Sequence, residues 1–284
     1  MFDYKKNGDA SVSLGVIQET LLIPLYCRAV ETLRHDGFII DNIAVEMVRN
    51  INYDFSKFEK DKALHLQVAI RTKVFDLAVS QFINKYPETV IVNLGAGLDT
   101  RFRRVDNQKI LWFDLDMPDS MQLRKRFLPE TERNRYIEKS MFDFSWIDEV
   151  TALRRTNEVP VLIVAEGLLL YFSEEENKSL FKTIADRMPH SYFLFHSTCP
   201  VVANNTSLSV SVSTTQATFK WGIRKNKEVE QWDPRYKVLD EWFFVEWKIW
   251  RWIKLGTPIY VPGYRKHYYE TMKVALVRLN FDNQ

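Results

Sequence analysis

The stretch VIVNLGAGLDTRFRR, from Val90 to Arg104, indicates how the rest of the chain folds. It begins as a short apolar run, typical of a strand buried on both faces, and continues directly into two glycines. Glycine after a buried strand often marks a turn where the backbone comes close to a ligand. The third glycine of a dinucleotide-binding turn is missing, and a carboxylate, Asp99, stands in the turn instead. We interpret the stretch as the ligand-binding turn of an α/β domain.

Similar apolar runs recur downstream and alternate with segments that have helical patterns. The runs cover residues 89–94, 109–115, 159–166 and 191–197. The helix-like segments cover residues 119–128, 143–156 and 173–188. Ser173 and Glu176 have the spacing of a capping box, so the last of these helices is expected to begin there. Alternating strands and helices predict an α/β fold with a doubly wound, mostly parallel sheet.

The flanking regions differ from this core in pattern. Apolar residues at three- and four-residue spacings predict helices between residues 14 and 85, so we expect residues 1–85 to form a helical cap on a core of residues 86–198. Residues 199–235 include a Ser/Thr/Asn-rich stretch, which is typical of a lid or insertion. Residues 236–284 contain two further apolar runs, 236–250 and 271–279, which we predict to be the final strands. All four parts are expected to form a single domain, residues 1–284.

Composition and charge exclude several classes of protein. A net charge of +2 gives no electrostatic reason to expect a nucleic-acid partner. No stretch approaches ~18 uninterrupted apolar residues, so we expect no membrane-spanning helix. The two cysteines, Cys27 and Cys199, lack the spacing of a metal site or a disulfide framework. The N-terminal residues are polar and unlike a signal peptide, which favours a cytoplasmic protein.

Two acids indicate which nucleotide the glycine turn would bind. Asp114 and Asp116 follow the second apolar run, about 20 residues after the glycines, where a carboxylate can bind both hydroxyls of a ribose. The missing third glycine disfavours a pyrophosphate. A cation that carries ribose and adenine without phosphate fits better, so we expect S-adenosylmethionine. A nicotinamide-dependent oxidoreductase stays open as an alternative, since a glycine pair followed by an acid also suits that cofactor.

Five motifs, in order, resemble the leucine carboxyl methyltransferase family. They read TLLIPLYCRAVET, AIRTKVFD, NLGAGLDTRFRR, WFDLDMP and VAEGLLLYFSEEE, and the resemblance runs from about Thr20 to Ser197. Within the family they are most similar to bacterial small-molecule O-methyltransferases of the tetracenomycin polyketide type. The resemblance implies a Rossmann-like class I methyltransferase fold, S-adenosylmethionine as cofactor, and a small acceptor with a carboxylate or a polyketide-like hydroxyl.

The resemblance also implies roles on the methionine side of the cofactor. Arg71 would bind the methionine carboxylate, for which a planar guanidinium is suited. Arg28 falls where the family has a basic residue near the same group. Gly95 and Gly97 would line the turn on this side. From the residues alone, we expect Arg101 to hold the turn through ion pairs, and Arg103 and Arg104 to be solvated.

Further roles implied by the resemblance belong to the nucleoside and the acceptor. Asp116 would hold the ribose, and Asp143 and Phe144 would contact adenine. Glu166 would lie below the reactive centre. An unpaired buried carboxylate at that point would be expensive, which favours a functional role. Tyr171 would stand near the acceptor.

The sequence leaves the catalytic mechanism and some alternatives open. A carboxylate acceptor needs no base, whereas a phenol, with a pKa near 10, would be helped by one. His196 could serve, but a lone histidine there is as often structural. We therefore expect direct in-line transfer with Tyr171 orienting the acceptor and no obligatory base. A methyltransferase of protein C-terminal carboxylates and a non-catalytic adenosyl-binding protein are the remaining alternatives.

Overall fold

The computed structural model describes residues 10–11, 15, 18–205, 217–258 and 261–280. Its centre is a seven-stranded sheet with the order β5-β4-β3-β6-β7-β9-β8. The strands are β3 (Val90–Leu94), β4 (Leu111–Asp116), β5 (Asn134–Glu138), β6 (Val161–Ala165), β7 (Ser191–Ser197), β8 (Lys237–Phe243) and β9 (Lys273–Arg278). Strands β3 to β7 are parallel, whereas β9 is antiparallel to both β7 and β8. The predicted doubly wound, mostly parallel sheet is therefore confirmed.

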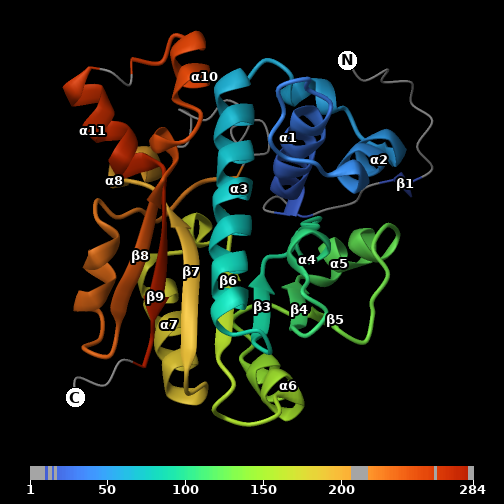
Figure 1. Ribbon diagram of the computed structural model, residues 1–284, viewed down its shortest axis with the longest axis vertical. Coiled ribbons are helices and arrows are strands. Elements are labelled where there is room, and N and C mark those ends of the chain that lie inside the picture. Colours follow the sequence, from blue (N-terminus) through green and yellow to red (C-terminus); the bar gives the residue numbers. More distant parts are fainter. Residues whose placement is uncertain (1–9, 12–14, 16–17, 206–216, 259–260, 281–284) are drawn as a thin grey trace.

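Helices cover both faces of this sheet. They are α1 (Leu22–Thr32), α2 (Asn42–Asn50), α3 (Lys62–Lys85), α4 (Arg101–Val105), α5 (Pro118–Lys125), α6 (Ser145–Leu153), α7 (Glu174–Arg187), α8 (Pro200–Ala203), α10 (Ile249–Lys254) and α11 (Pro262–Thr271). Short 3₁₀ turns are η1 (Gln18–Leu21), η2 (Phe55–Phe58), η3 (Leu169–Tyr171), η5 (Asn226–Gln231) and η6 (Phe244–Glu246), and a small separate pair joins β1 (Ala10–Ser11) to β2 (Ile51–Asn52). Helix α3 runs along the sheet, with α1 and α2 on one side of it and α10 and α11 on the other (Figure 1).

The apolar runs form strands because both of their faces are buried. Along β3, Val90, Val92 and Leu94 pack into the cluster that contains the apolar residues of α6 and α7. Ile91, which points the opposite way, packs into the cluster formed with α3. Side chains alternate across a strand, so a strand with helices on both faces needs apolar residues at successive positions. This requirement explains the run VIV in the stretch that opened the sequence analysis.

The central elements agree with the sequence predictions, and two features differ. Strand β5 was not predicted, because its sequence mixes polar and apolar residues and it lies at the edge of the sheet. The run 236–250 was predicted to be one strand, which is wrong beyond Phe243. Phe243 pairs with Lys273, the first residue of β9, so the sheet offers no further partner. The chain then forms η6, and Lys248 in a left-handed conformation leads into α10.

Other predictions are met in part. The capping box is confirmed, since the Ser173 hydroxyl accepts from the Glu176 amide and the Glu176 carboxylate accepts from the Ser173 amide. Of the predicted lid, α8, η5 and residues 217–225 are described, whereas residues 206–216 lie outside the described part of the chain. The described residues contain no helix that is long and apolar enough to cross a membrane.

A buried ion pair joins the first and last helical regions of the chain. Arg251 of α10 donates from Nη1 and Nη2 to the two carboxylate oxygens of Glu31 in α1, at 2.7 and 2.9 Å. The Glu31 carboxylate also accepts from the amide of Phe38, at 3.2 Å. The Phe38 ring centroid lies 5.2 Å from the Arg251 guanidinium carbon. The pair thus fixes α10 against α1 although 220 residues separate its members.

We predict that Arg251→Met lowers the free energy of unfolding by at most about 3–5 kcal/mol, because it removes two hydrogen bonds to the buried Glu31 carboxylate and leaves only Arg34, whose Nε lies 3.8 Å away, as a counter-charge. The double variant Glu31→Leu with Arg251→Met should recover much of this loss, since no buried charge remains. Urea unfolding of the wild type and both variants measures the effect. Equal stability of the single variant and the wild type would contradict the proposed link between α1 and α10.

Candidate active site

The turn after β3 has a backbone shape that requires its glycines. Gly95 and Gly97 have positive φ angles, 63° and 46°. A Cβ atom at Gly95 would lie 2.7 Å from Cδ1 of Leu168, and one at Gly97 would lie 3.0 Å from Cβ of Leu21. Glycine is therefore required at both positions, because the backbone is left-handed there and neighbouring segments pack too closely for a Cβ atom. This packing places the turn at the switch point of the sheet, where β4 lies on one side of β3 and β6 on the other.

Two buried arginines bind the carbonyl groups of the turn. Arg28 of α1 donates from Nη2 to the carbonyl of Leu98, at 2.7 Å. Arg124 of α5 donates from Nη1 to the carbonyls of Gly97 and Asp99, at 3.0 and 2.7 Å. Arg124 also forms a 2.6 Å ion pair with Asp114. Asp114 is therefore buried in the protein and does not line the ligand cavity. The turn is therefore held from two sides before any ligand binds.

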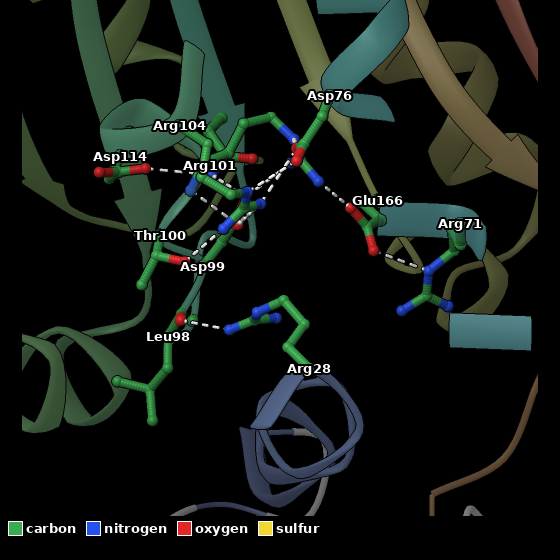
Figure 2. A network of polar contacts seen from close by, with 12 residues as sticks. Arg28, Arg71, Asp76, Leu98, Asp99, Thr100, Arg101, Arg104, Asp114 and Glu166 are labelled. Atoms are coloured by element: carbon green, nitrogen blue, oxygen red, sulfur yellow. Dashed lines mark hydrogen bonds and ion pairs between the residues drawn. The ribbon is translucent and has the colours of Figure 1, made fainter. Parts of the chain in front are cut away.

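Asp99, the residue that set this turn apart, belongs to a network of ion pairs (Figure 2). Arg101, whose side chain is 1% exposed, donates to Asp99 at 2.6 Å and to Asp76 at 2.9 Å. Although burial opposes ionisation, Arg101 and Arg104 hold the pKa of Asp99 well below its usual range. The expectation that Arg101 holds the turn through ion pairs is confirmed. The carboxylate in the turn thus has a structural role.

The expectation for Arg104 was wrong, whereas Arg103 is exposed as predicted. The Arg104 side chain is 14% exposed and donates from Nε to Asp76, at 2.7 Å. It also bonds the hydroxyl of Thr100 and lies 3.4 Å from a carboxylate oxygen of Asp41. Helix α4 places successive arginines on different faces, and the face of Arg104 points toward the acids of α3 and the segment before α2.

Glu166 follows β6 and is paired with two arginines. Arg71 of α3 donates from Nε to Oε1 at 2.8 Å, and Arg101 donates to Oε2. Burial favours the neutral acid, but the positive charges of Arg101 and Arg71 prevail and lower the pKa of Glu166. Because Glu166 is paired, the sequence-based argument that an unpaired buried carboxylate favours a functional role does not apply to it. The geometry gives Glu166 the role of orienting Arg71.

Arg71 presents its remaining nitrogens to a cavity. Nη1 and Nη2 have no hydrogen-bond partner among the described residues, and Nη1 lies 3.0 Å from the position that a Cβ atom of Gly167 would take. With Nε already engaged by Glu166, the outer edge of the guanidinium can bind a carboxylate through two N–H groups. This is the geometry that the methionine carboxylate of S-adenosylmethionine requires.

The cavity has a volume of about 620 Å³ and lies beyond the carboxyl ends of the parallel strands. Most of the residues predicted for the site line it, namely Arg28, Arg71, Gly95, Gly97, Asp116, Glu166, Tyr171 and His196. No cluster of three or more histidine, cysteine or acidic side chains able to hold a metal ion occurs in the described part of the chain. Residues from the separate sequence motifs thus line one cavity at the switch point of the sheet.

Asp143 and Phe144, the residues predicted to contact adenine, do not line this cavity. Asp143 is exposed, and its carboxylate accepts from the amide and the hydroxyl of Ser145, at 3.2 and 2.7 Å. The wall at this point consists of residues 139–141, directly after β5. The adenine assignment therefore stays a prediction that the geometry does not support. Recognition of β5 in the sequence would have indicated residues 139–141, because ligands bind beyond the carboxyl ends of strands.

Asp116 ends β4 at the floor of the cavity. Its Oδ2 accepts from the amide of Gly97 and its Oδ1 from that of Met117, both at 2.7 Å. The surrounding protein shields the carboxyl from water, which raises the pKa of Asp116 from 3.8 to about 6 despite these two bonds. Each oxygen keeps a lone pair for one hydroxyl of a ribose diol. The residue present here therefore fits the predicted adenosyl group.

Aromatic side chains also line the cavity. They are Tyr171, Phe219 and Tyr268, and the ring centroids of Tyr171 and Phe219 lie 5.3 Å apart. Residues 267, 268, 271 and 272, from α11 and the residue after it, belong to the lining too, and no sequence motif pointed to them. They reach the site only because β9 runs antiparallel to β7, which brings the residues before β9 to the carboxyl end of β7.

Comparison with known proteins defines the class of the enzyme. A protein of the DUF574 family from Streptomyces avermitilis shares the fold, with a TM-score of 0.58 over 93% of this chain and 99% of that one, at 15% identity. An S-adenosyl-L-methionine-dependent methyltransferase from Gibberella zeae is 29% identical over 194 residues, which are 63% of this chain and 64% of that protein. Together with the geometry of Arg71 and Asp116, these findings define a class I methyltransferase whose cofactor is S-adenosylmethionine.

Two further comparisons give the family. The profile of the leucine carboxyl methyltransferase family matches residues 22–185. A tetracenomycin polyketide synthesis O-methyltransferase from Streptomyces glaucescens is 30% identical over 237 residues, which are 83% of this chain and 86% of that protein. The chain therefore belongs to the leucine carboxyl methyltransferase family. The alternative of a nicotinamide-dependent oxidoreductase finds no support in these comparisons.

We predict that Arg71→Met and Asp116→Ala each weaken S-adenosylmethionine binding by about tenfold or more, because each removes charge-assisted hydrogen bonds that contribute roughly 1.5–3 kcal/mol. Isothermal titration calorimetry with S-adenosylhomocysteine and S-adenosylmethionine measures the loss. Arg103→Met, at an exposed position of α4 directly after the turn, is the matched control and should bind as the wild type does. Wild-type affinity in the Arg71 and Asp116 variants would contradict the assignment.

The raised pKa of Asp116 predicts a dependence of stability on pH. A carboxyl whose pKa rises on folding stabilises the folded state below its unfolded value of 3.8, and this contribution is lost as the pH rises through about 6. Asp116→Asn keeps an acceptor for the Gly97 amide but cannot ionise. Relative to the wild type, the variant should therefore gain stability between about pH 4 and pH 7, by at most about 3 kcal/mol. Urea unfolding across this range tests the prediction, and a constant difference between the two proteins would contradict it.

Proposed function

We infer that the protein is an O-methyltransferase that transfers a methyl group directly to a small-molecule acceptor with a carboxylate or a polyketide-like hydroxyl. The observation that carries this proposal is that one cavity of about 620 Å³ is lined by Asp116 and Arg71 together with the aromatic side chain of Tyr171. Its volume is within the range of small-molecule sites. The relative from Streptomyces glaucescens is an O-methyltransferase of tetracenomycin polyketide synthesis, which supports the same acceptor class.

Different side chains would bind the cofactor and orient the acceptor in such a reaction. S-Adenosylmethionine, when bound, supplies an electrophilic methyl group on a positively charged sulfur. Arg71, held by Glu166, binds the carboxylate at one end of the cofactor, and Asp116 binds the ribose hydroxyls. Tyr171 would orient the acceptor; it is 7% exposed, and burial raises the pKa of its hydroxyl, which therefore stays protonated at neutral pH. Direct in-line transfer depends mainly on this alignment.

Chain segments beside Tyr171 would cover the bound acceptor. The amides of Lys220 and Trp221 donate to the carbonyl of Leu170, at 2.7 and 3.2 Å, so the segment after residue 217 is anchored beside Tyr171. Leu21 and Ile23, from η1 and α1, also line the cavity and belong to the same apolar cluster as Tyr171 and Phe219. We expect the segments 14–35 and 200–222 to close over the bound acceptor while the glycine turn stays on the rigid sheet.

The proposal predicts which ligands bind and where the methyl group goes. Calorimetry should detect S-adenosylmethionine and S-adenosylhomocysteine but not NAD. Incubation with methyl-labelled cofactor and a panel of phenols, aryl carboxylates and amines should label oxygen, as read by mass spectrometry. Tyr171→Phe should lower the transfer rate and leave cofactor affinity unchanged. Binding of NAD alone, or transfer to nitrogen only, would refute the proposed function.

A protein acceptor gives a different outcome in the same assay. A methyltransferase of C-terminal carboxylates would label a peptide with a free C-terminus, and amidation of that peptide would abolish labelling. A peptide with a C-terminal leucine and its amidated form therefore belong in the panel. Labelling of the free peptide in preference to all small molecules would replace the small-molecule proposal.

A further inference from the structure

One short region holds many of the exposed apolar side chains in the described part of the chain. Half of the large apolar side chains that are exposed there lie between residues 249 and 264, namely Ile249, Trp250, Ile253, Leu255, Val261 and Tyr264. They belong to α10, the residues next to it and the start of α11, at the end of the molecule where the parallel strands have their carboxyl ends (Figure 1). A cluster of exposed apolar side chains of this kind marks an interaction surface.

Helix α10 presents apolar side chains on its outer face. Ile253 follows Ile249 by four positions and Trp250 by three, so the three side chains share one face of the helix. Each of them is about half exposed. The opposite face carries Trp252 and Arg251, which are buried and attach the helix to the body of the protein, Arg251 through its ion pair with α1. A surface helix normally turns its apolar stripe toward the core, whereas α10 also has one toward the outside.

Positive charges surround these apolar side chains. Four exposed side chains among the described residues 246–267 are cationic, namely Lys248, Lys254, Arg265 and Lys266. The one exposed acid in the same residues, Glu246, accepts a hydrogen bond from the hydroxyl of Tyr269, at 3.0 Å. The excess of three positive charges is larger than the net charge of the whole chain, which is +2. This surface is therefore positive although the protein is nearly neutral.

The lysines of this surface lie beside aromatic rings and not beside acids. Nζ of Lys254 lies 5.9 Å from the ring centroid of Trp250, and Nζ of Lys248 lies 5.2 Å from that of Phe38. Within the part of the chain that the structure describes, neither lysine forms an ion pair, and Lys266 forms none either. Aromatic rings with adjacent lysines are typical of segments that lie in the headgroup region of a bilayer.

The composition of the surface favours an anionic bilayer over a protein as its occupant. Lysine is depleted in protein–protein interfaces. A second copy docked through the same surface would bring like charges together, with Glu246 as the one exposed acid of these described residues to offset them. A bilayer that contains anionic lipids can bind apolar and cationic side chains at once, and it needs no complementary pocket.

We propose that these six apolar and four cationic side chains form a docking surface for a lipid bilayer that contains anionic lipids. Helix α11 connects this docking surface to the cavity, because Tyr264 and Arg265 near its start belong to the surface, while Tyr268 and Thr271 line the cavity. Docking therefore holds the cavity close to the bilayer, where lipophilic molecules are concentrated. The docking surface goes beyond the proposed methyl transfer and does not depend on it.

Sedimentation with lipid vesicles tests the docking surface directly. The vesicles consist of phosphatidylcholine alone or of an equal mixture of phosphatidylcholine and phosphatidylglycerol. The wild type should bind the anionic vesicles at least about tenfold more tightly than the neutral ones, because the exposed cations are attracted to the lipid phosphates. Added salt should weaken this binding, since it screens exposed charges.

Two double variants separate the apolar and the cationic contributions. Trp250→Ser with Ile253→Ser should weaken binding to the anionic vesicles by about tenfold or more, because it removes apolar area that enters the headgroup region. Lys254→Gln with Lys266→Gln should weaken it by about 25-fold, since each cation near an anionic surface contributes about fivefold. The second variant should bind neutral vesicles as the wild type does.

Matched controls lie at the opposite end of the sheet, in segments that precede β6, β3 and β4. They are Leu153→Ser, at a side chain that is 44% exposed, and Lys85→Gln with Lys109→Gln, at two exposed lysines. Both controls should bind the vesicles as the wild type does. All variants should bind S-adenosylhomocysteine with wild-type affinity, which shows that they are folded. Failure of the wild type to bind S-adenosylhomocysteine would refute the proposed function and not the docking surface.

Several outcomes would overturn the docking surface. These are no binding of the wild type to anionic vesicles, equal binding to both kinds of vesicle, or losses in the controls as large as those in the variants. Dimers in analytical ultracentrifugation that Trp250→Ser with Ile253→Ser dissociates would assign the surface to a second copy. Binding to soluble polyglutamate without binding to vesicles would assign it to an acidic protein.

Discussion

A chain of buried ion pairs holds the cofactor side of this enzyme, and the remaining site depends on it. Its members are the cations Arg28, Arg71, Arg101 and Arg104 and the acids Asp41, Asp76, Asp99 and Glu166. The pairs run without interruption from α1 through α4 to α3, and so connect the helical cap to the turn after β3 and to the residue that follows β6. Figure 2 shows the part of this chain around Asp99, Arg101 and Glu166. Through this chain, Arg71 is oriented by the same residues that fix the shape of the glycine turn.

Such a network contributes more to position than to net stability. Taking two charges out of water costs free energy that their attraction only roughly offsets, so apolar residues of similar volume could stabilise the fold equally well. Apolar residues could not, however, direct a guanidinium edge toward the cavity or hold the carbonyls of the turn. The number of charges beneath this site is therefore best explained by the need for a precise, preformed binding surface. The same reasoning explains why Glu166, though buried and charged, need not touch any ligand.

Local sequence patterns predicted the elements that depend on local physics. The buried strands, the capping box at Ser173 and the placement of Asp116 and Glu166 at strand ends follow from such patterns and from the geometry of parallel sheets, whereas the role of Arg71 was implied only by the family resemblance. The pairing of Arg104, the early end of β8 and the contribution of α11 depend on contacts between distant segments, which no local pattern records. His196 illustrates the limit most clearly. Whether a histidine is structural or catalytic depends on the partners of its ring nitrogens, and these become visible only in the folded chain.

The two walls of the cavity come from different parts of the sequence. The wall around Asp116 belongs to the regular sheet and its ion pairs, whereas the wall around Tyr268 comes from α11, a late segment that enters the site through the reversed strand β9. Substitutions in the late segment can therefore change which acceptors fit without altering how the methyl donor is held. This separation would allow the same donor site to be combined with a different acceptor wall.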